Sequence, residues 1–148
     1  MSAVGAITIP KLLLVDDDPN DAILTRRALE RAHIGNELMV VETGEGALEI
    51  LYRQALEERE EVGLVLLDLR LPKIDGREVL RQIWSDRRLR QIPVFVLTGS
   101  ASEEDMLRSY KAGAVAFLRK PVEVDQLLRA VGDLPSYRLL IAKTPSGG

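Results

Sequence analysis

The 148-residue sequence contains no cysteine, one histidine and few aromatic residues, which make up 4% of the chain. Without cysteine, a disulfide framework and a thiolate metal site are both excluded, and a reducing cytosol is compatible with the composition. No stretch approaches the roughly 20 apolar residues that a membrane-spanning helix needs. We therefore expect a protein without membrane segments, whose fold is stabilised by a hydrophobic core and not by disulfides.

Neither sign of charge dominates, because 20 basic residues face 23 acidic ones and the net charge is −3. This balance does not favour binding to nucleic acid or to an anionic membrane. The apolar segment from Ala3 to Val15 lacks a basic flank and is interrupted by Pro10 and Lys11, which argues against a signal peptide. The length and the 46% of hydrophobic residues suit one soluble domain. We predict a cytoplasmic protein that binds no DNA.

Short apolar runs alternate along the chain with segments of helical spacing. Runs of four or five mostly apolar residues are typical of strands covered on both faces. The five runs are Leu12–Val15, Leu38–Val41, Leu64–Leu67, Val94–Leu97 and Val115–Leu118. The helical segments are marked in turn by Leu24, Ala28 and Ala32; by Leu48, Leu51 and Ala55; by Val79, Leu80, Ile83 and Trp84; by Met106, Leu107 and Tyr110; and by Val124, Leu127, Leu128, Val131 and Leu134.

Residues that start or stop helices support the same division. Pro19 suits the first turn of the first helix, and Asp75–Gly76 forms a turn signal ahead of the third. Ser100 and Glu103 form a capping box for the fourth helix, and Gly113 is its stop signal. The order predicts an α/β fold of the (βα)₅ type: a doubly wound, five-stranded parallel sheet with helices on both faces.

Polar residues stand where four of the predicted strands end. Taken alone, an aspartate at such a place is usually a helix cap, and a lysine is usually on the surface. In a parallel sheet, however, the carboxyl ends of the strands meet at one edge, where ligands bind. The residues at this edge are Asp16, Asp17 and Asp18; Asp68; Thr98; and Lys120 with Pro121. We predict that they form one site.

Phosphoryl transfer to a carboxylate is the chemistry that uses all of these groups. An aspartate can act as the nucleophile and hold an acyl phosphate. Mg²⁺ prefers one or two carboxylates together with phosphate oxygens and water. A lysine supplies a positive charge for phosphate oxygens, and a threonine hydroxyl can donate to them.

Four motifs resemble those of the receiver domains of two-component response regulators. They are LLLVDDDPND, LVLLDLRLPKIDG, FVLTGS and AFLRKP, and their order and spacing agree from about Lys11 to Asp133. The resemblance implies a flavodoxin-like fold, Mg²⁺ as the cofactor and a sensor histidine kinase as the phosphate donor. It implies a signalling switch that catalyses its own phosphorylation and slow dephosphorylation, and no other enzyme activity.

The resemblance implies that Asp68 is the phospho-acceptor and, like Asp17, a direct ligand of Mg²⁺. Asp16 would act largely through water, and the backbone carbonyl of Arg70 would complete the protein ligands. Arg70 stands where many members of the family have a smaller polar residue. Its side chain could therefore change access to the phosphate and the lifetime of the phosphorylated state.

The same resemblance assigns the remaining residues to the phosphate and to a switch. Thr98 and the backbone N–H of Gly99 would bind the phosphoryl group, and Lys120 would pair with it before a cis Lys120–Pro121 bond. Thr98 would move toward the phosphate and let Phe117 turn inward. Phe117 lacks the hydroxyl of the commoner tyrosine, so this switch would depend on packing alone.

A closer resemblance is to small response regulators that serve phytochrome-type sensor kinases. It rests on a long second helix through Glu61 and on the segments SDRRLRQIPVFVLT and EVDQLLRAV. We divide the chain into a lead-in (1–10), a receiver domain (11–134) and a C-terminal extension (135–148). The segment Tyr137–Ile141 is either an arm that packs on its own domain or one exchanged in a homodimer through the fourth helix, fifth strand and fifth helix. The extension is too short for a DNA-binding domain, so the effector would be another protein or the dimer itself.

Two other functions use a similar pattern. A phosphatase of the haloacid-dehalogenase type needs a second carboxylate two residues after the nucleophile, where this chain has Arg70. An unphosphorylated scaffold usually lacks the acidic pair, the acceptor or the lysine, which are all present here. The single histidine, His33, is expected on the surface at a helix end, and the arginines of Asp86–Arg90 in a charged loop.

Overall fold

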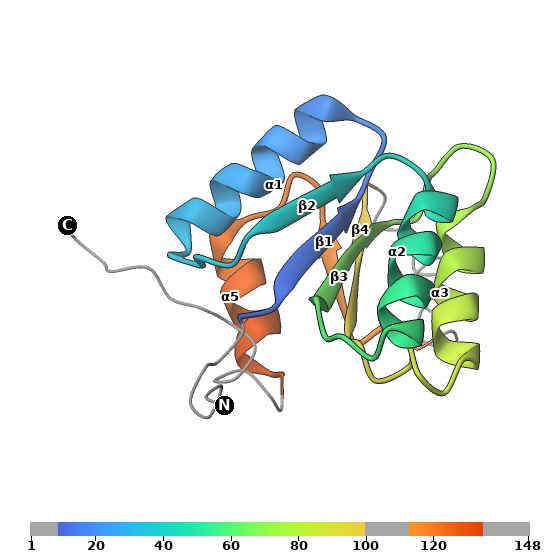
Figure 1. The fold of residues 1–148 in the computed structure, drawn as a ribbon. Coiled ribbons are helices and arrows are strands. Elements are labelled where there is room, and N and C mark those ends of the chain that lie inside the picture. Colours follow the sequence, from blue (N-terminus) through green and yellow to red (C-terminus); the bar gives the residue numbers. More distant parts are fainter. Residues whose placement is uncertain (1–8, 100–112, 135–148) are drawn as a thin grey trace, which may run out of the picture.

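The computed structural model describes residues 9–99 and 113–134. Five parallel strands form one sheet in the order β2-β1-β3-β4-β5, and four helices flank it within the described residues (Figure 1). This confirms the predicted doubly wound fold. The strands are β1 (Lys11–Val15), β2 (Leu38–Val41), β3 (Val62–Asp68), β4 (Val94–Thr98) and β5 (Ala116–Arg119). The helices are α1 (Pro19–Arg31), α2 (Gly44–Leu56), α3 (Gly76–Ser85) and α5 (Val124–Gly132).

Several predictions fall outside the described residues. The predicted fourth helix, including Ser100 and Glu103 of its capping box, lies within 100–112. The predicted arm Tyr137–Ile141 lies within 135–148. Gly113, the expected stop signal, is described and has a φ of 100°, a conformation that favours glycine.

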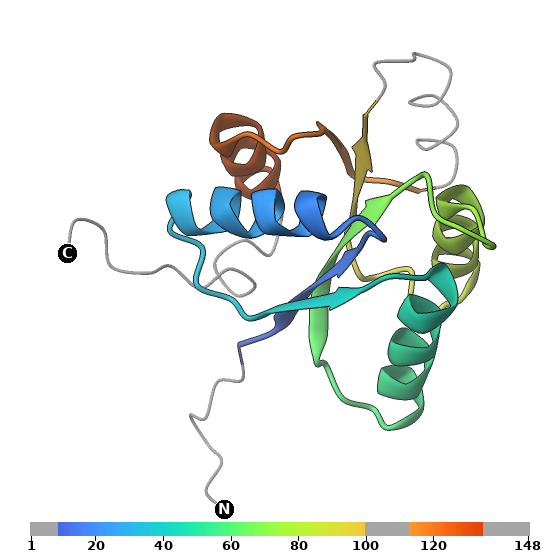
Figure 2. The ribbon, with the colours of Figure 1, turned by 90° about the horizontal axis from the view of Figure 1, so that it is seen from above.

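The helices cover both faces of the sheet, with α1 and α5 on one side and α2 and α3 on the other (Figure 2). Each strand therefore contributes to two cores. Leu12 and Leu14 of β1 pack in the cluster beneath α1 and α5, whereas Leu13 and Val15 pack in the cluster beneath α2 and α3. Because alternate side chains of a strand point to opposite faces, a strand buried on both sides is apolar at every position.

Side-chain caps fix the starts of three helices at the carboxyl-end side of the sheet. Asp18 caps α1 and accepts a hydrogen bond from the backbone N–H of Asn20 at 2.8 Å, with Pro19 in the first turn as predicted. Thr43 caps α2 in the same way, and Asp75 caps α3. Each cap satisfies a backbone donor that the helix itself leaves without a partner.

The second helix is shorter than predicted, because α2 ends at Leu56 and does not extend through Glu61. Glu58 adopts a left-handed φ of 53°, and the N–H of Arg59 donates to the carbonyl of Gln54 at 3.0 Å. The buried Gln54 side chain also exchanges two hydrogen bonds with the main chain of Val62, at 2.7 and 3.0 Å. These contacts turn the chain out of the helix and into β3.

Some apolar residues of the predicted stripes are not in the core. Leu24 is 41% exposed, because α1 turns Thr25, Ala28 and Leu29 toward the sheet instead. Trp84 is 49% exposed at the end of α3. The fifth strand begins at Ala116, one residue later than predicted. The expected surface positions are confirmed: His33 is exposed directly after α1, and Asp86–Arg90 form a turn.

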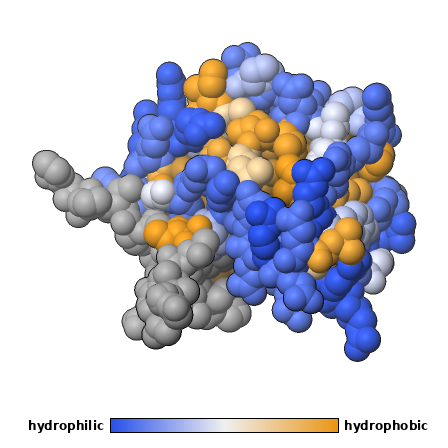
Figure 3. All heavy atoms as spheres, viewed as in Figure 1, coloured by the Kyte–Doolittle hydropathy of each residue, from blue (hydrophilic) through white to orange (hydrophobic). Residues whose placement is uncertain are grey.

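An apolar patch lies over the edge strand β2 and the adjoining part of α1 (Figure 3). The large apolar residues exposed in these two elements are Ile23, Leu24 and Val40. Among the described residues, no helix is long and apolar enough to cross a membrane.

Candidate functional site

Three aspartates meet where β1 and β3 end. The two strands are neighbours in the sheet, and Val15 pairs with Leu67, so Asp16 and Asp68 are side by side. Asp16, Asp17 and Asp68 each offer a carboxylate oxygen, and these oxygens all lie within 4.8 Å of one another. Asp16 and Asp68 are buried and Asp17 is exposed. Asp17 is therefore the member of the group that solvent reaches most easily.

The ammonium of Lys120 also reaches this cluster. Lys120 directly follows β5, the edge strand on the other side of β3 from β1. Its Nζ lies 3.0 Å from an oxygen of Asp68, 3.4 Å from one of Asp16 and 2.7 Å from one of Asp21. The backbone N–H of Lys120 donates to the carbonyl of Thr98 at 2.8 Å, which attaches this loop to the end of β4. The Lys120–Pro121 peptide bond is cis. The carboxyl ends of β1, β3, β4 and β5 thus lie close together around Lys120.

The buried charges alter the acidity of two groups. Burial raises the pKa of Asp16 to about 6, and it outweighs the backbone N–H of Asp18 and the charge of Lys120, which both favour the carboxylate. Burial alone would lower the pKa of Lys120. Its hydrogen bonds to Asp21 and Asp68 outweigh burial, so the pKa of the ammonium lies above its ordinary value. The lysine therefore stays charged, whereas the protonated form of Asp16 becomes accessible below neutral pH.

Main-chain hydrogen bonds hold the two buried carboxylates in place. One oxygen of Asp16 accepts from the N–H of Asp18 at 3.0 Å, and one oxygen of Asp68 accepts from the N–H of Arg70 at 3.1 Å. The start of α3 packs closely behind Asp68, since a Cβ added to Gly76 would lie 2.4 Å from the carbonyl oxygen of Asp68. A residue with a side chain would therefore displace the loop that carries Asp68.

The three carboxylates suit a small, hard cation such as Mg²⁺. Ligand oxygens at about 2.1 Å from an octahedral ion lie about 3 to 4.2 Å apart, which is compatible with oxygens that all lie within 4.8 Å of one another. All three are oxygen donors, and Asp17 is exposed, so water could complete the coordination. Asp16, Asp17 and Asp68 are thus the side chains that would hold the ion.

The other predicted site residues lie on β4, on β5 and in the loops after β3 and β4, and their roles remain predictions. Thr98 is buried at the end of β4, and Gly99 follows it in an exposed position with open space around it. Arg70 is exposed two residues after Asp68. Phe117 is half-buried in β5, paired with Val96 of β4, and packs against the cluster beneath α2 and α3.

Asp21 belongs to the site but was missed by the sequence analysis. It lies in the first turn of α1 and makes the shortest of the three carboxylate contacts of Lys120. The motif LLLVDDDPND gave only a partial signal, because it shows that Asp21 stands three residues after the helix cap Asp18 but not where α1 packs. On a helix this spacing returns a side chain to the face of the cap.

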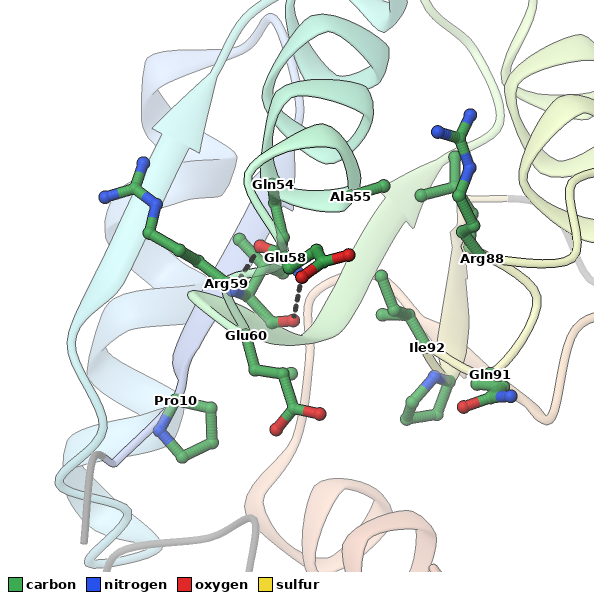
Figure 4. A pocket seen from close by; sticks show the side chains of 13 residues that line it. Pro10, Gln54, Ala55, Glu58, Arg59, Glu60, Arg88, Gln91 and Ile92 are labelled. Atoms are coloured by element: carbon green, nitrogen blue, oxygen red, sulfur yellow. Dashed lines mark hydrogen bonds between the residues drawn. The ribbon is translucent and has the colours of Figure 1, made fainter. Parts of the chain in front are cut away.

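A hollow of about 660 Å³ lies at the opposite end of the strands from the aspartates (Figure 4). It is lined by residues near the starts of the strands, including Pro10, Val62 and Pro93. Its arginines Arg59 and Arg88 are paired with Glu57 and Asp86. None of the aspartates of the site lines it. The hollow is therefore separate from the aspartate cluster at the carboxyl ends of the strands.

The fold and this site define a receiver domain. Residues 12–132 match the response regulator receiver domain family, so the chain belongs to this family. The probable methanogenesis regulatory protein FilR2 of Methanothrix harundinacea is 40% identical over 134 residues, covering 90% of this chain and 86% of the relative. The response regulator Rcp1 of Synechocystis is 36% identical over 136 residues, covering 91% of this chain and 92% of the relative.

The solved structures similar to this chain include phytochrome response regulators, as the closer resemblance predicted. The bacteriophytochrome response regulator RtBRR is 43% identical with a TM-score of 0.78, covering 95% of this chain and 86% of that chain. The phosphorylated cyanobacterial phytochrome response regulator RcpA is 36% identical with a TM-score of 0.70, covering 94% and 100%. The Mn²⁺-bound form of Rcp1 is 34% identical with a TM-score of 0.67, covering 93% and 99%.

Proposed function

We propose that this receiver domain is phosphorylated on Asp68 by a sensor histidine kinase, in the presence of Mg²⁺. The observation that carries the proposal is the convergence of Asp16, Asp17 and Asp68 with the Lys120 ammonium, whose Nζ lies 3.0 Å from Asp68. The manganese-bound and phosphorylated forms of the related regulators support it.

In this reaction an oxygen of the Asp68 carboxylate bonds to phosphorus while the bond between phosphorus and the kinase histidine nitrogen breaks. The electron pair of that bond stays with the imidazole, which leaves and takes up a proton. When bound, Mg²⁺ would neutralise charge on the phosphoryl group. The ion would be held by the three aspartates and the backbone carbonyl of Arg70.

Three groups of the chain would bind the phosphoryl oxygens. The Lys120 ammonium already lies beside Asp68, so it would meet the phosphoryl group without a large movement. Thr98 would donate its hydroxyl and Gly99 its backbone N–H. Gly99 is exposed directly after β4, next to Thr98. The strand ends hold these groups in position before the phosphoryl group arrives. The chain would therefore catalyse its own phosphorylation by small donors.

Phosphorylation would then change a protein-binding surface. Movement of Thr98 toward the phosphate would open space for Phe117, which shares the β4–β5 strand pair with Thr98. The affected surface includes β5 and α5, through which we expect homodimerisation or binding of a downstream protein. The phytochrome-linked relatives favour a bacteriophytochrome kinase as the donor.

The proposal predicts Mg²⁺-dependent labelling by acetyl phosphate. The mass of the intact protein should increase by one phosphoryl group with Mg²⁺, and not with EDTA. The Asp68→Asn variant should remain unlabelled, because its amide cannot act as the nucleophile. Asp75→Asn is the matched control, since it changes an exposed aspartate of the same loop while asparagine still caps α3. Full labelling of Asp68→Asn would refute the proposal.

A further inference from the structure

The ammonium of Lys120 is shared by three carboxylates, and only two of them belong to the candidate metal group. Asp16 and Asp68 are in that group, whereas Asp21 is not. Asp21 nevertheless makes the shortest contact, with 2.7 Å between its oxygen and Nζ. The side chains are largely removed from solvent, with exposed fractions of 16% for Lys120 and 24% for Asp21. This pair is therefore only weakly screened.

The local structure aims Asp21 at the lysine. Asp18 caps α1 with Pro19 in the first turn, which places Asp21 at the third helical position. Side chains of a helix tilt toward its N-terminus, so this position faces the end of β1. The carboxylate is thus fixed by the helix and does not depend on a flexible loop.

A lysine ammonium has three N–H donors, and here three carboxylates accept from them. A phosphoryl oxygen that binds Lys120 must therefore take a donor from one of these partners. Mg²⁺ would neutralise Asp16 and Asp68 and weaken their attraction for the lysine. Asp21 would keep its full charge and its contact.

We propose that Asp21 is a positioning residue that shares Lys120 with the phosphoryl site, an inference that rests on the proposed function. The Asp21 carboxylate attracts the ammonium away from Asp16 and Asp68, which leaves these two aspartates more available to Mg²⁺. The same carboxylate competes with the phosphoryl group for the ammonium. Asp21 therefore strengthens the binding of Mg²⁺ and weakens the binding of the phosphoryl group.

Removal of the charge of Asp21 should change the two affinities in opposite directions. In Asp21→Asn, we expect Mg²⁺ alone to bind roughly three- to tenfold more weakly, as expected for one partly buried unit charge near the ion. At saturating Mg²⁺, beryllium trifluoride, an anionic analogue of the phosphoryl group, should bind more tightly by a similar factor. Isothermal titration calorimetry on the full chain measures both affinities.

Two further variants serve as controls. Asp125→Asn removes an exposed carboxylate from the first turn of α5 and should change neither affinity. Asp21→Glu keeps the charge and should not reproduce the opposite changes seen in Asp21→Asn. Denaturant unfolding of each variant checks that the fold is intact.

The outcomes separate this inference from the proposed function. If both affinities fall together in Asp21→Asn, or if neither changes, Asp21 has only a structural role and the inference is wrong. If Asp21→Glu behaves like Asp21→Asn, charge is not the cause, and the inference is equally wrong. If the wild-type chain binds no beryllium trifluoride, the proposed function itself fails. It fails equally if Asp68→Asn binds beryllium trifluoride as tightly as the wild type does.

Discussion

Replacement of Asp16 by asparagine should make the metal-free protein more stable at neutral pH. Asp16 is 1% exposed and its carboxylate lies beside the carboxylates of Asp17 and Asp68. Asparagine has nearly the same shape, keeps an oxygen for the N–H of Asp18 and carries no charge. The substitution therefore removes an unfavourable buried charge without creating a cavity.

The pKa of Asp16 sets the size and pH dependence of this effect. Because the pKa rises from the ordinary 3.8 to about 6 on folding, the folded state holds a proton that the unfolded state has lost between these values. Below pH 3.8 the carboxyl is neutral in both states and costs nothing. The cost grows as the pH rises and is complete above pH 6, where it reaches at most about 3 kcal/mol. We expect a gain in unfolding free energy of about 1–3 kcal/mol for Asp16→Asn at pH 7.5.

Urea unfolding in EDTA between pH 4 and pH 8 measures this difference from the wild type. Asp17→Asn is the matched control, because it removes a neighbouring candidate ligand whose side chain is exposed. In saturating Mg²⁺ the gap should narrow, since the ion stabilises the wild type, with its full set of carboxylates, more than the variant. Equal or lower stability of Asp16→Asn in EDTA at pH 7.5 would contradict this explanation. A gain that does not diminish toward pH 4 would contradict it as well.

Two further predictions concern the fold around the site. Gln54→Leu should lower the unfolding free energy by about 2–4 kcal/mol, because it leaves the buried N–H and carbonyl of Val62 without the glutamine side chain. Gly76→Ala should lower it by at least about 2 kcal/mol and weaken Mg²⁺ binding, because the new Cβ collides with the backbone at Asp68. Urea unfolding measures both effects, and calorimetry measures Mg²⁺ binding.

Matched variants decide whether these effects have the stated causes. Gln91→Leu makes the same substitution at an exposed position and should leave stability within about 0.5 kcal/mol of the wild type. Gly132→Ala places a methyl group in open space and should not destabilise the protein. A loss in either control as large as in its partner variant would show that the local contacts are not the cause.

The fold was predictable because its signals are local and repeated. Strands buried on both faces are apolar at every position, so runs such as Leu12–Val15 could be recognised without knowledge of their partners. The end of α2 was not predictable in the same way. It depends on a hydrogen-bonded pair between Gln54 and Val62, and on a left-handed glutamate, Glu58, where a glycine would have been the usual signal.

The candidate site was predictable to the extent that strand ends define it. Asp16, Asp68 and Lys120 each follow or end a strand, so the topology of a parallel sheet was enough to bring them together. Asp21 does not follow a strand, and its place in the site depends on the angle at which α1 leaves the sheet. That angle is set by packing of Ala28 and Leu29 against the core, which local sequence patterns do not encode.

The hydrogen bond from the N–H of Lys120 to the carbonyl of Thr98 couples two of the site's residues through their main chains. Substitution of either side chain leaves this coupling in place, so variants of Thr98 and Lys120 test chemistry without uncoupling the two loops. A displacement of the β4 terminus would therefore reach the end of β5, the outermost strand, through this main-chain hydrogen bond. The link needs a backbone N–H at position 120 and no particular side chain.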